Sequence, residues 1–326
     1  MKPGVRIILI LLVIAGFALL AGRQDETRAQ QVGDKVGGMK TYCIGRYLLD
    51  VPETFTMTRS DVSIGLPRAV RVVELGPLGA KTLPDHVAAR IAQLRGGVTE
   101  DGASFRYADK AQLGDIQLIA TKKYDPDLPT YESRSINVEA YFVRHDHLFR
   151  ASVGPFASLD EVAQLDADPQ QVGLAAIADA TWPRDNETLP SRPGICADRA
   201  LIDLPVVNDA ASAGFTDPDA FGVGLSVTTS QQRGAQTDFR ENPLSGLVGT
   251  DVEIAGIAGR ETRSVSREDR MMMFEAHGIE GGAEGEQTRQ VGLKLFKNDV
   301  ELDAAPYPTA ELDAIWRAVL ASVKMR

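Results

Sequence analysis

Cysteine and histidine are scarce in this sequence, with two and four residues among 326. So few ligands exclude an iron–sulfur protein and a disulfide-rich scaffold, and they leave little material for a metal enzyme. Basic residues are also outnumbered, because 35 lysines and arginines face 45 acidic residues. The resulting net charge of −10 counts against a nucleic-acid partner, which requires a basic face to neutralise phosphates.

Common catalytic and nucleotide-binding motifs are absent as well. The sequence has no Gly-x-Ser-x-Gly elbow, Walker loop, dinucleotide fingerprint or His-Glu-x-x-His helix. We therefore expect no enzyme and no cofactor. With 44% hydrophobic and 25% charged residues, the composition is that of a folded protein, and the length suits two domains.

The chain begins with an export segment. Residues 7–22 are uncharged and apolar and follow Lys2 and Arg6, which is typical of a signal peptide or a short membrane anchor. Arg23 stands where a lipoprotein would have its cysteine, so lipid attachment is excluded there. Cleavage after Ala29 and an uncleaved anchor both stay open, and the polar residues that follow predict a tether up to residue 40.

An internal repeat organises the rest of the chain. Residues 43–52 (CIGRYLLDVP) and 196–205 (CADRALIDLP) share Cys, Arg, Leu, Asp and Pro at one constant offset. Each copy begins a segment of domain size, and a polar stretch rich in proline separates the two. We predict a leader and tether at residues 1–40, followed by related domains at residues 41–184 and 191–326.

Each domain is predicted to be α+β, with a mainly antiparallel sheet and helices packed on one side. Alternating side chains predict strands at residues 69–75, 135–144, 148–153, 252–266, 270–276 and 288–297. Helices are expected over residues 84–94, from Asp168-Pro169 towards Trp182, and from Thr309. The apolar stripes of the first and last helices are Val87, Ile91 and Leu94, and Leu312, Ile315, Trp316, Val319, Leu320 and Val323.

The two cysteines occupy equivalent positions of the repeat, which favours a structural role over a catalytic thiol. Cys43 and Cys196 leave two states open: a disulfide between the domains, favoured by an oxidising compartment, or two free buried thiols. The sequence cannot decide between these states, since a disulfide requires Cα atoms within about 7 Å.

Other polar clusters also point to structural roles. His145-Asp146-His147 would place two imidazoles on one strand face, but a polar hairpin turn is favoured because no motif supplies further metal ligands. Arg46 with Asp50, and Arg199 with Asp203, are interpreted as ion pairs or turn bonds that fix strand ends.

Two further segments are interpreted from their side-chain pattern. Alternation across Met271–Phe274 places Met272 and Phe274 on one buried face of a strand. Residues 231–246 and 278–287 are expected to be surface loops.

The first residues of the two predicted domains resemble those of a known protein family. Tyr42-Cys43-Ile44-Gly45-Arg46, leading to Leu49-Asp50-Val51-Pro52, resembles the start of the immunity proteins cognate to type VI secreted phospholipases. Cys196–Pro205 resembles the start of the C-terminal domain of that family. Gly259-Arg260-Glu261 and the strand Met273–Gly278 are also similar to that domain, and the resemblance covers residues 41–326 in order and length.

This resemblance implies a periplasmic, non-enzymatic inhibitor whose two domains grip a cognate phospholipase effector like a clamp. Such a clamp would hinder lid motion or substrate access. The protein would be soluble after signal cleavage, or tethered to the inner membrane by residues 7–22. The toxin contacts are expected in the cleft between the repeats and at its rim loops, residues 231–246 and 278–287, and an acidic clamp would steer a basic partner.

Two other functions remain compatible with the sequence. One is an exported solute- or lipid-binding protein with its ligand between the domains. The other is an envelope hydrolase that uses Cys43 or His145. A co-purified small molecule would favour the first, and turnover that Cys43→Ala abolishes would favour the second.

Overall fold

The structure, a computed structural model, describes most of the chain after the leader. The described residues are 38–65, 70–100, 102–168, 172–186, 188–205, 208–220, 222–233, 249–266, 271–281, 287–298, 307 and 309–326. The apolar segment 7–22 lies outside them, so export and anchoring stay predictions. Within the described part of the chain, no helix is both long enough and apolar enough to cross a bilayer.

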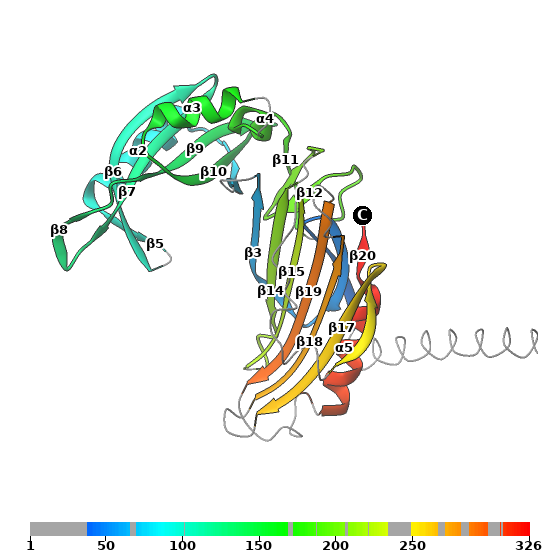
Figure 1. Ribbon diagram of the computed structural model, residues 1–326. Coiled ribbons are helices and arrows are strands. Elements are labelled where there is room, and N and C mark those ends of the chain that lie inside the picture. The colour runs from blue at the N-terminus through cyan, green and yellow to red at the C-terminus, as the bar shows by residue number, and fades with distance from the viewer. Residues whose placement is uncertain are drawn as a thin grey trace, which may run out of the picture.

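A single 14-stranded antiparallel sheet runs through both halves of the chain (Figure 1). The first half contributes β3 (Thr56–Ile64), β4 (Val70–Pro77), β5 (Val98–Glu100), β6 (Ala103–Leu113), β7 (Ile116–Asp125), β8 (Leu128–Glu132), β9 (Ile136–Arg144) and β10 (His147–Phe156). The second half contributes β14 (Asp209–Thr216), β15 (Val223–Arg233), β16 (Thr250–Ile254), β17 (Ile257–Ser266), β18 (Met271–Glu280) and β19 (Gln287–Asn298). The order is β16-β17-β18-β19-β15-β14-β3-β4-β10-β9-β7-β6-β5, with β8 beside β7.

The two halves of this sheet meet at β3. This strand pairs with β14 over its whole length, whereas its pairing with β4 is limited to Ser63 with Arg71 and Ile64 with Val70. Figure 1 shows the consequence: the strands from β4 to β5 form one lobe, and those from β3 to β16 form another. The fold is therefore α+β and mainly antiparallel, as predicted, but the two predicted segments share one sheet.

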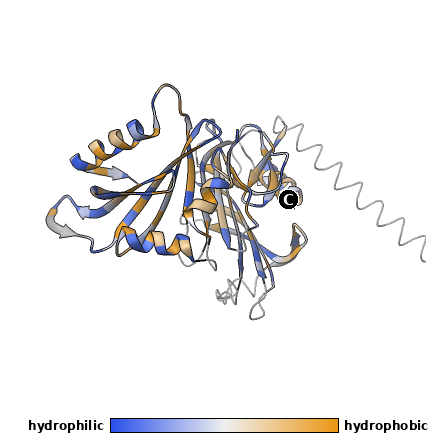
Figure 2. Ribbon diagram, turned by 90° about the horizontal axis from the view of Figure 1, so that it is seen from above, coloured by the Kyte–Doolittle hydropathy of each residue, from blue (hydrophilic) through white to orange (hydrophobic). Residues whose placement is uncertain are grey.

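Helices cover both faces of the sheet in the first lobe (Figure 2). On one face, α2 (Leu83–Gly96) buries its predicted stripe of Val87, Ile91 and Leu94 against Ile119, Tyr141 and Leu148. On the other face, α3 (Leu159–Ala167) and α4 (Leu174–Asp179) pack in the main core with Leu118 and Ala120. The expectation of helices on one side fails here because neighbouring residues of β7 are all buried, so both faces of that strand are apolar.

The second lobe carries its helix on one face. α5 (Thr309–Ser322) buries Leu312, Ile315, Trp316, Val319 and Leu320, and Val323 just beyond it is also buried, as the stripe predicted. The carboxylate of Glu261 accepts hydrogen bonds from Trp316 Nε1 at 3.0 Å and from Arg317 Nη1 at 2.6 Å. Glu261 belongs to the motif Gly259-Arg260-Glu261, so that motif anchors α5 on β17.

The repeat motifs form two small hairpins. The first hairpin is β1 (Met39–Ile44) with β2 (Tyr47–Pro52), and the second is β12 (Ile195–Ala197) with β13 (Ala200–Ile202). Each hairpin gains a third strand from the end of the opposite half: β2 pairs with β20 (Lys324–Met325), and β13 pairs with β11 (Thr181–Pro183). Gly45 and Cys196 exchange backbone hydrogen bonds of 3.1 and 2.8 Å, which join the two hairpins directly.

The strand order agrees with a duplication. β3-β4-β10-β9-β7-β6 in the first half matches β14-β15-β19-β18-β17-β16 in the second, and the motif cysteines are separated by 153 residues. The two lobes of the structure do not coincide with the two halves of the sequence, however, because β2 and β3 of the first half pair with strands of the second half. The domain boundaries at residues 41–184 and 191–326 stay a prediction.

Two predicted elements differ from the structure. The strand expected at residues 252–266 is a hairpin, because Ala255 (φ 54°) and Gly256 (φ 80°) turn the chain between β16 and β17. Within the helix predicted from Asp168-Pro169 towards Trp182, α4 covers Leu174–Asp179, whereas Asp168 ends α3 and Pro169 lies outside the described residues. The sequence analysis missed α3, whose first turn carries the acidic residues Asp160 and Glu161 that favour a helix start.

The turn at Gly45 allows a test of the contact between the two repeat hairpins, because Gly45 exchanges backbone hydrogen bonds with Cys196. Gly45 has φ +56°, and a Cβ there would lie 2.8 Å from both Ala211 Cβ and Thr229 Oγ1. Gly256 has φ +80° but open space around it, so it is the matched control for backbone strain alone. We expect Gly45→Ala to lower the free energy of unfolding by about 1–3 kcal/mol more than Gly256→Ala, measured by urea denaturation. Equal losses would show that the junction relaxes without a clash.

Candidate binding surface

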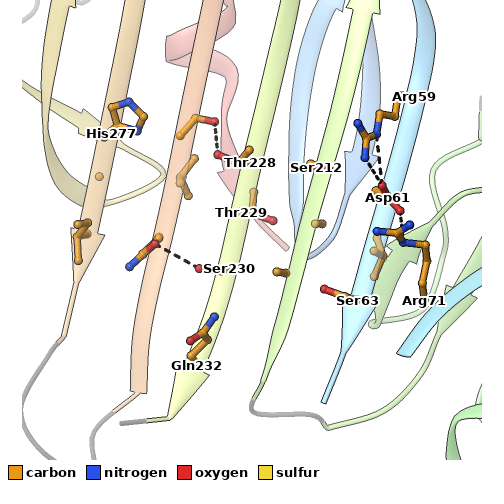
Figure 3. Close-up of a pocket in the computed structure, with 18 residues that line it drawn as sticks. Arg59, Asp61, Ser63, Arg71, Ser212, Thr228, Thr229, Ser230, Gln232 and His277 are labelled. Carbon is orange, nitrogen blue, oxygen red and sulfur yellow. Dashed lines mark hydrogen bonds and ion pairs between the residues drawn. The ribbon is translucent and has the colours of Figure 1, made fainter. Parts of the chain in front are cut away.

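A trough of about 420 Å³ lies on one face of the main sheet, in the second lobe beside its junction with β4 (Figure 3). Its floor is formed by β14, β15 and β19. Strand register aligns Ser212 with Thr228 and Gly292 in one row, and Ala210 with Ser230 in the next. These side chains are all small, which makes the surface hollow.

Charged residues form one wall of the trough. Asp61 on β3 accepts a hydrogen bond from Arg59 Nη2 at 2.7 Å and pairs with Arg71 Nε at 2.5 Å. The side chains of Arg59 and Arg71 are 70% and 51% exposed, whereas that of Asp61 is 17% exposed. This wall therefore presents two guanidinium groups around one carboxylate, a net charge of +1, in a chain with a charge of −10.

The opposite wall is formed by His277 and Ile279 on β18, with Gln290 on β19 in front of them. A Cβ on Gly292 would lie 2.7 Å from Thr228 Oγ1 and 3.0 Å from His277 Nδ1, so a larger residue there would require these two side chains to move. Figure 3 shows Ser212 and Thr228 between His277 on one side and the Arg59–Asp61–Arg71 group on the other.

The trough lies close to the predicted rim loops. Of residues 231–246, the first three belong to β15, and Gln232 lines the trough. Of residues 278–287, Gly278 and Ile279 belong to β18 and also line it. The remaining loop residues, 234–246 and 282–286, lie outside the described part of the chain, so their part in binding stays a prediction.

The sequence interpretation did not single out the floor of the trough. Its signal is the alternation of apolar and small polar residues in β15, as in Leu225-Ser226-Val227-Thr228, together with the run of small residues Ala210-Ala211-Ser212-Ala213-Gly214 in β14. Such alternation indicates a strand with one solvated face. This alternation does not show that the solvated faces of β3, β14, β15, β19 and β18 lie side by side, because that depends on pairing between distant segments.

The arginine of each repeat motif forms an ion pair with a carboxylate in the other half of the chain. Arg46 Nε pairs with Asp209 Oδ2 at 2.7 Å, and Arg199 Nε pairs with Glu74 at 2.9 Å. Both carboxylates are buried and lie in the half of the chain opposite to their arginine. Burial raises the pKa of Asp209, although Arg46 opposes the shift. Both arginines thus make ion pairs, with carboxylates that their local sequence did not indicate.

The His145–His147 cluster is a hairpin turn. His145 (φ 50°) and Asp146 (φ 61°) form the turn between β9 and β10. The ring of His145 stacks on Trp182 with centroids 3.7 Å apart, while His147 Nδ1 lies 2.5 Å from Glu74 Oε1. Among the described residues, no three His, Cys, Asp or Glu side chains gather as a metal ion would require.

Cys43 and Cys196 are bonded to each other in the structure, with their Cα atoms 5.8 Å apart. Both are buried, and Leu48, Trp182 and Leu201 pack around them. Bonded in this way, Cys43 offers no thiolate to a substrate. The disulfide links the two repeat hairpins at the point where they already share backbone hydrogen bonds.

Comparison with known proteins gives a match in structure alone. No family model matches the chain, and no curated protein matches its sequence. The fold matches the crystal structure of the Tle4–Tli4 complex with a TM-score of 0.59 and 17% identity, over 89% of this chain and 98% of that one. It also matches the immunity protein TplEi of the type VI secretion system (T6SS) from Pseudomonas aeruginosa, complexed with the "L" peptide, with a TM-score of 0.56 and 19% identity. This chain has the fold of a T6SS immunity protein.

The immunity-protein fold extends over nearly the whole described chain. The match to TplEi with its peptide covers 89% of this chain and 98% of that one, and apo TplEi matches with a TM-score of 0.55 over 88% and 97%. The resemblance carried by the two repeat motifs is therefore confirmed at the level of the fold. With 17–19% identity, the match gives no contact residues, which have to come from this chain itself.

Proposed function

We propose that this protein is an immunity protein that binds and inhibits a cognate T6SS phospholipase effector. The observation that carries the proposal is the fold match with T6SS immunity proteins over 97–98% of their length. The repeat motifs support it independently, because their resemblance to the immunity proteins of secreted phospholipases rests on sequence. On this view the protein acts by binding and catalyses no reaction.

The proposed inhibition is steric. The two lobes of the sheet meet at β3 and β4, and the trough lies beside that junction, where a partner held between the lobes would touch it. A bound effector would be blocked either in the motion of its lid or in the access of its lipid substrate. The buried disulfide and the exchanged hairpins would hold the lobes in a fixed relation, so binding would lose little conformational entropy.

The proposed compartment is the periplasm. Residues 7–22 have the character of an export segment, and they would either be cleaved or tether the protein to the inner membrane. A disulfide between Cys43 and Cys196 suits the same compartment, because disulfides persist in oxidising environments. The protein would meet the effector where the effector attacks phospholipid.

The direct test uses the protein purified from the periplasm of an expression host, titrated against the lipase encoded beside its gene. We expect tight one-to-one binding by calorimetry and loss of phospholipase activity at the same equivalence point, since inhibition follows occupancy. An adjacent lipase that stays fully active in an excess of this protein would contradict the proposal. A small molecule released from the purified protein on unfolding would instead support an exported solute- or lipid-binding protein.

A further inference from the structure

The trough lies on the same face of the sheet that α2 covers in the first lobe. Tyr141, which packs under α2, pairs with Arg150, and Arg150 pairs with Val73 on β4. Val73 and Arg71 are two residues apart in that strand, so their side chains share a face. Arg71 lines the trough. The α2 face and the trough face are therefore continuous.

Within the described part of the chain, this face carries α2 in the first lobe and no helix in the second. In the second lobe, α5 packs on the opposite face, against Phe274 and Leu293 in the main core. Among the described residues, no helix packs on the trough face of β14, β15 and β19, and Thr228 and His277 are exposed on that face. In the first lobe α2 contacts β6, β7 and β9, whose counterparts in the matching strand order are β16, β17 and β18, so the trough floor lies on the same face, beside the position that corresponds to α2.

The dimensions and side chains of the trough fit such a helix. Four strand spacings separate β3 from β18, which amounts to roughly 19 Å, and a helix with its side chains is about 10–12 Å across. Small residues on the floor would let the helix lie close to the sheet. The charged wall defines the chemistry of the helix: Arg71 uses its Nε for Asp61, and its side chain is half exposed. A carboxylate is the group that this guanidinium would bind through its outer edge.

We propose that the trough binds an α-helix of the effector, seated on the small residues of β14, β15 and β19, with an acidic side chain held by Arg71. This inference rests on the proposed function and specifies the element of the effector that is recognised. Because the molecule as a whole carries a net charge of −10, it would not attract an acidic helix from a distance. The arginines of the wall would instead act at short range and set the orientation of the bound helix.

Filling the trough tests the steric part. Ser212→Trp places a large side chain on the floor, and the dissociation constant for the co-encoded lipase is expected to rise at least about tenfold. The matched control is Ser264→Trp, because Ser264 is an exposed residue of β17 outside the trough lining. Thermal melting of both variants verifies that each remains folded. Equal affinities for the two variants would overturn the inference.

Reversing the wall charge tests the electrostatic part. Arg71→Glu is expected to weaken binding about 30-fold or more and to flatten the loss of affinity with added salt. Arg263→Glu is the matched control, because Arg263 pairs with Asp313 on the other face and is 43% exposed, close to the 51% of Arg71. If both variants bind as the wild type does, no carboxylate is held by this wall.

A photo-crosslinker identifies the bound element. With p-benzoylphenylalanine at position 232, which lines the trough away from its central floor, the cross-linked lipase peptide is expected to come from a helix that contains aspartate or glutamate. A cross-link to an extended loop, or to residues 234–248 of this chain, would contradict the inference while leaving the proposed function intact. If the wild-type protein does not bind the lipase at all, the proposed function fails and this inference fails with it.

Discussion

Replacing Glu139 with glutamine is expected to lower the free energy of unfolding by about 3 kcal/mol or more, because it removes one partner of a buried ion pair. Glu139 accepts hydrogen bonds from Arg90 Nη2 at 2.6 Å and Nε at 3.0 Å, and from the Tyr141 hydroxyl at 2.7 Å. The side chains of Arg90 and Glu139 are 10% and 12% exposed. This pair fastens α2 to β9, so its loss would loosen the helix that covers the first lobe.

The same variant is expected to change the pH dependence of stability. Burial by itself would raise the pKa of Glu139, but the hydrogen bonds from Arg90 and Tyr141 outweigh it and hold the pKa below the usual 4.5. The folded-state pKa is thus below that of the unfolded chain, so the stabilisation is fully present above pH about 4.5 and is lost as the pH falls through the folded-state pKa. Urea denaturation between pH 3 and 7 should show a shallower acid loss in Glu139→Gln than in the wild type.

Glu100→Gln is the control for this experiment. Glu100 also accepts two hydrogen bonds from Arg90, at 2.8 and 3.0 Å, but its side chain is 40% exposed. Solvent screens such a pair, so we expect a loss of about 1 kcal/mol or less. If both variants lower the free energy of unfolding by the same amount, burial of Glu139 does not account for the stabilising effect of its ion pair with Arg90.

Removing the disulfide is expected to lower the free energy of unfolding by about 2–5 kcal/mol. The bond joins residues 153 positions apart, so its loss would free a long loop of the unfolded chain. The double variant Cys43→Ala/Cys196→Ala is preferable to either single variant, which would leave one free thiol buried beside Arg326. Urea denaturation of the oxidised wild type and the double variant gives the difference.

Reduction of the wild-type protein is the control for the disulfide. Dithiothreitol should lower the unfolding midpoint of the wild type towards that of the double variant and leave the double variant unchanged. Alkylation of the unfolded protein without reductant reports the pairing directly. Two labelled thiols in protein taken from the periplasm would contradict the disulfide and restore the alternative of two free buried cysteines.

Local patterns were sufficient where neighbouring residues determine the structure. The apolar stripes of α2 and α5 predicted both helices, since a 3.6-residue period buries one side of a helix whatever packs against it. Alternation predicted β9, β10 and β19 for the corresponding reason. The pattern at Met271–Phe274 likewise identified Met272 and Phe274 as the buried side of β18.

Long-range pairing explains the expectations that the structure changed. Arg46 and Arg199 were interpreted with acidic neighbours a few residues away, whereas their ion pairs are with Asp209 and Glu74. Nothing in the local sequence shows that the two hairpins exchange partners between the halves. The turn at Ala255-Gly256 was missed because alternation continues on both sides of it and resembles one long strand.

The sequence by itself predicted the export segment, the absence of familiar catalytic motifs, the repeat of the two hairpin segments, the helices α2 and α5, and several strands such as β9, β10 and β19. These features depend on composition and short-range periodicity. Only the tertiary structure decided that both halves share one sheet, that Cys43 meets Cys196, and that Arg71 stands beside a floor of small residues. The physical reason is that strand pairing joins segments far apart in the chain. The trough exists only after β3, β14, β15, β19 and β18 have paired in register.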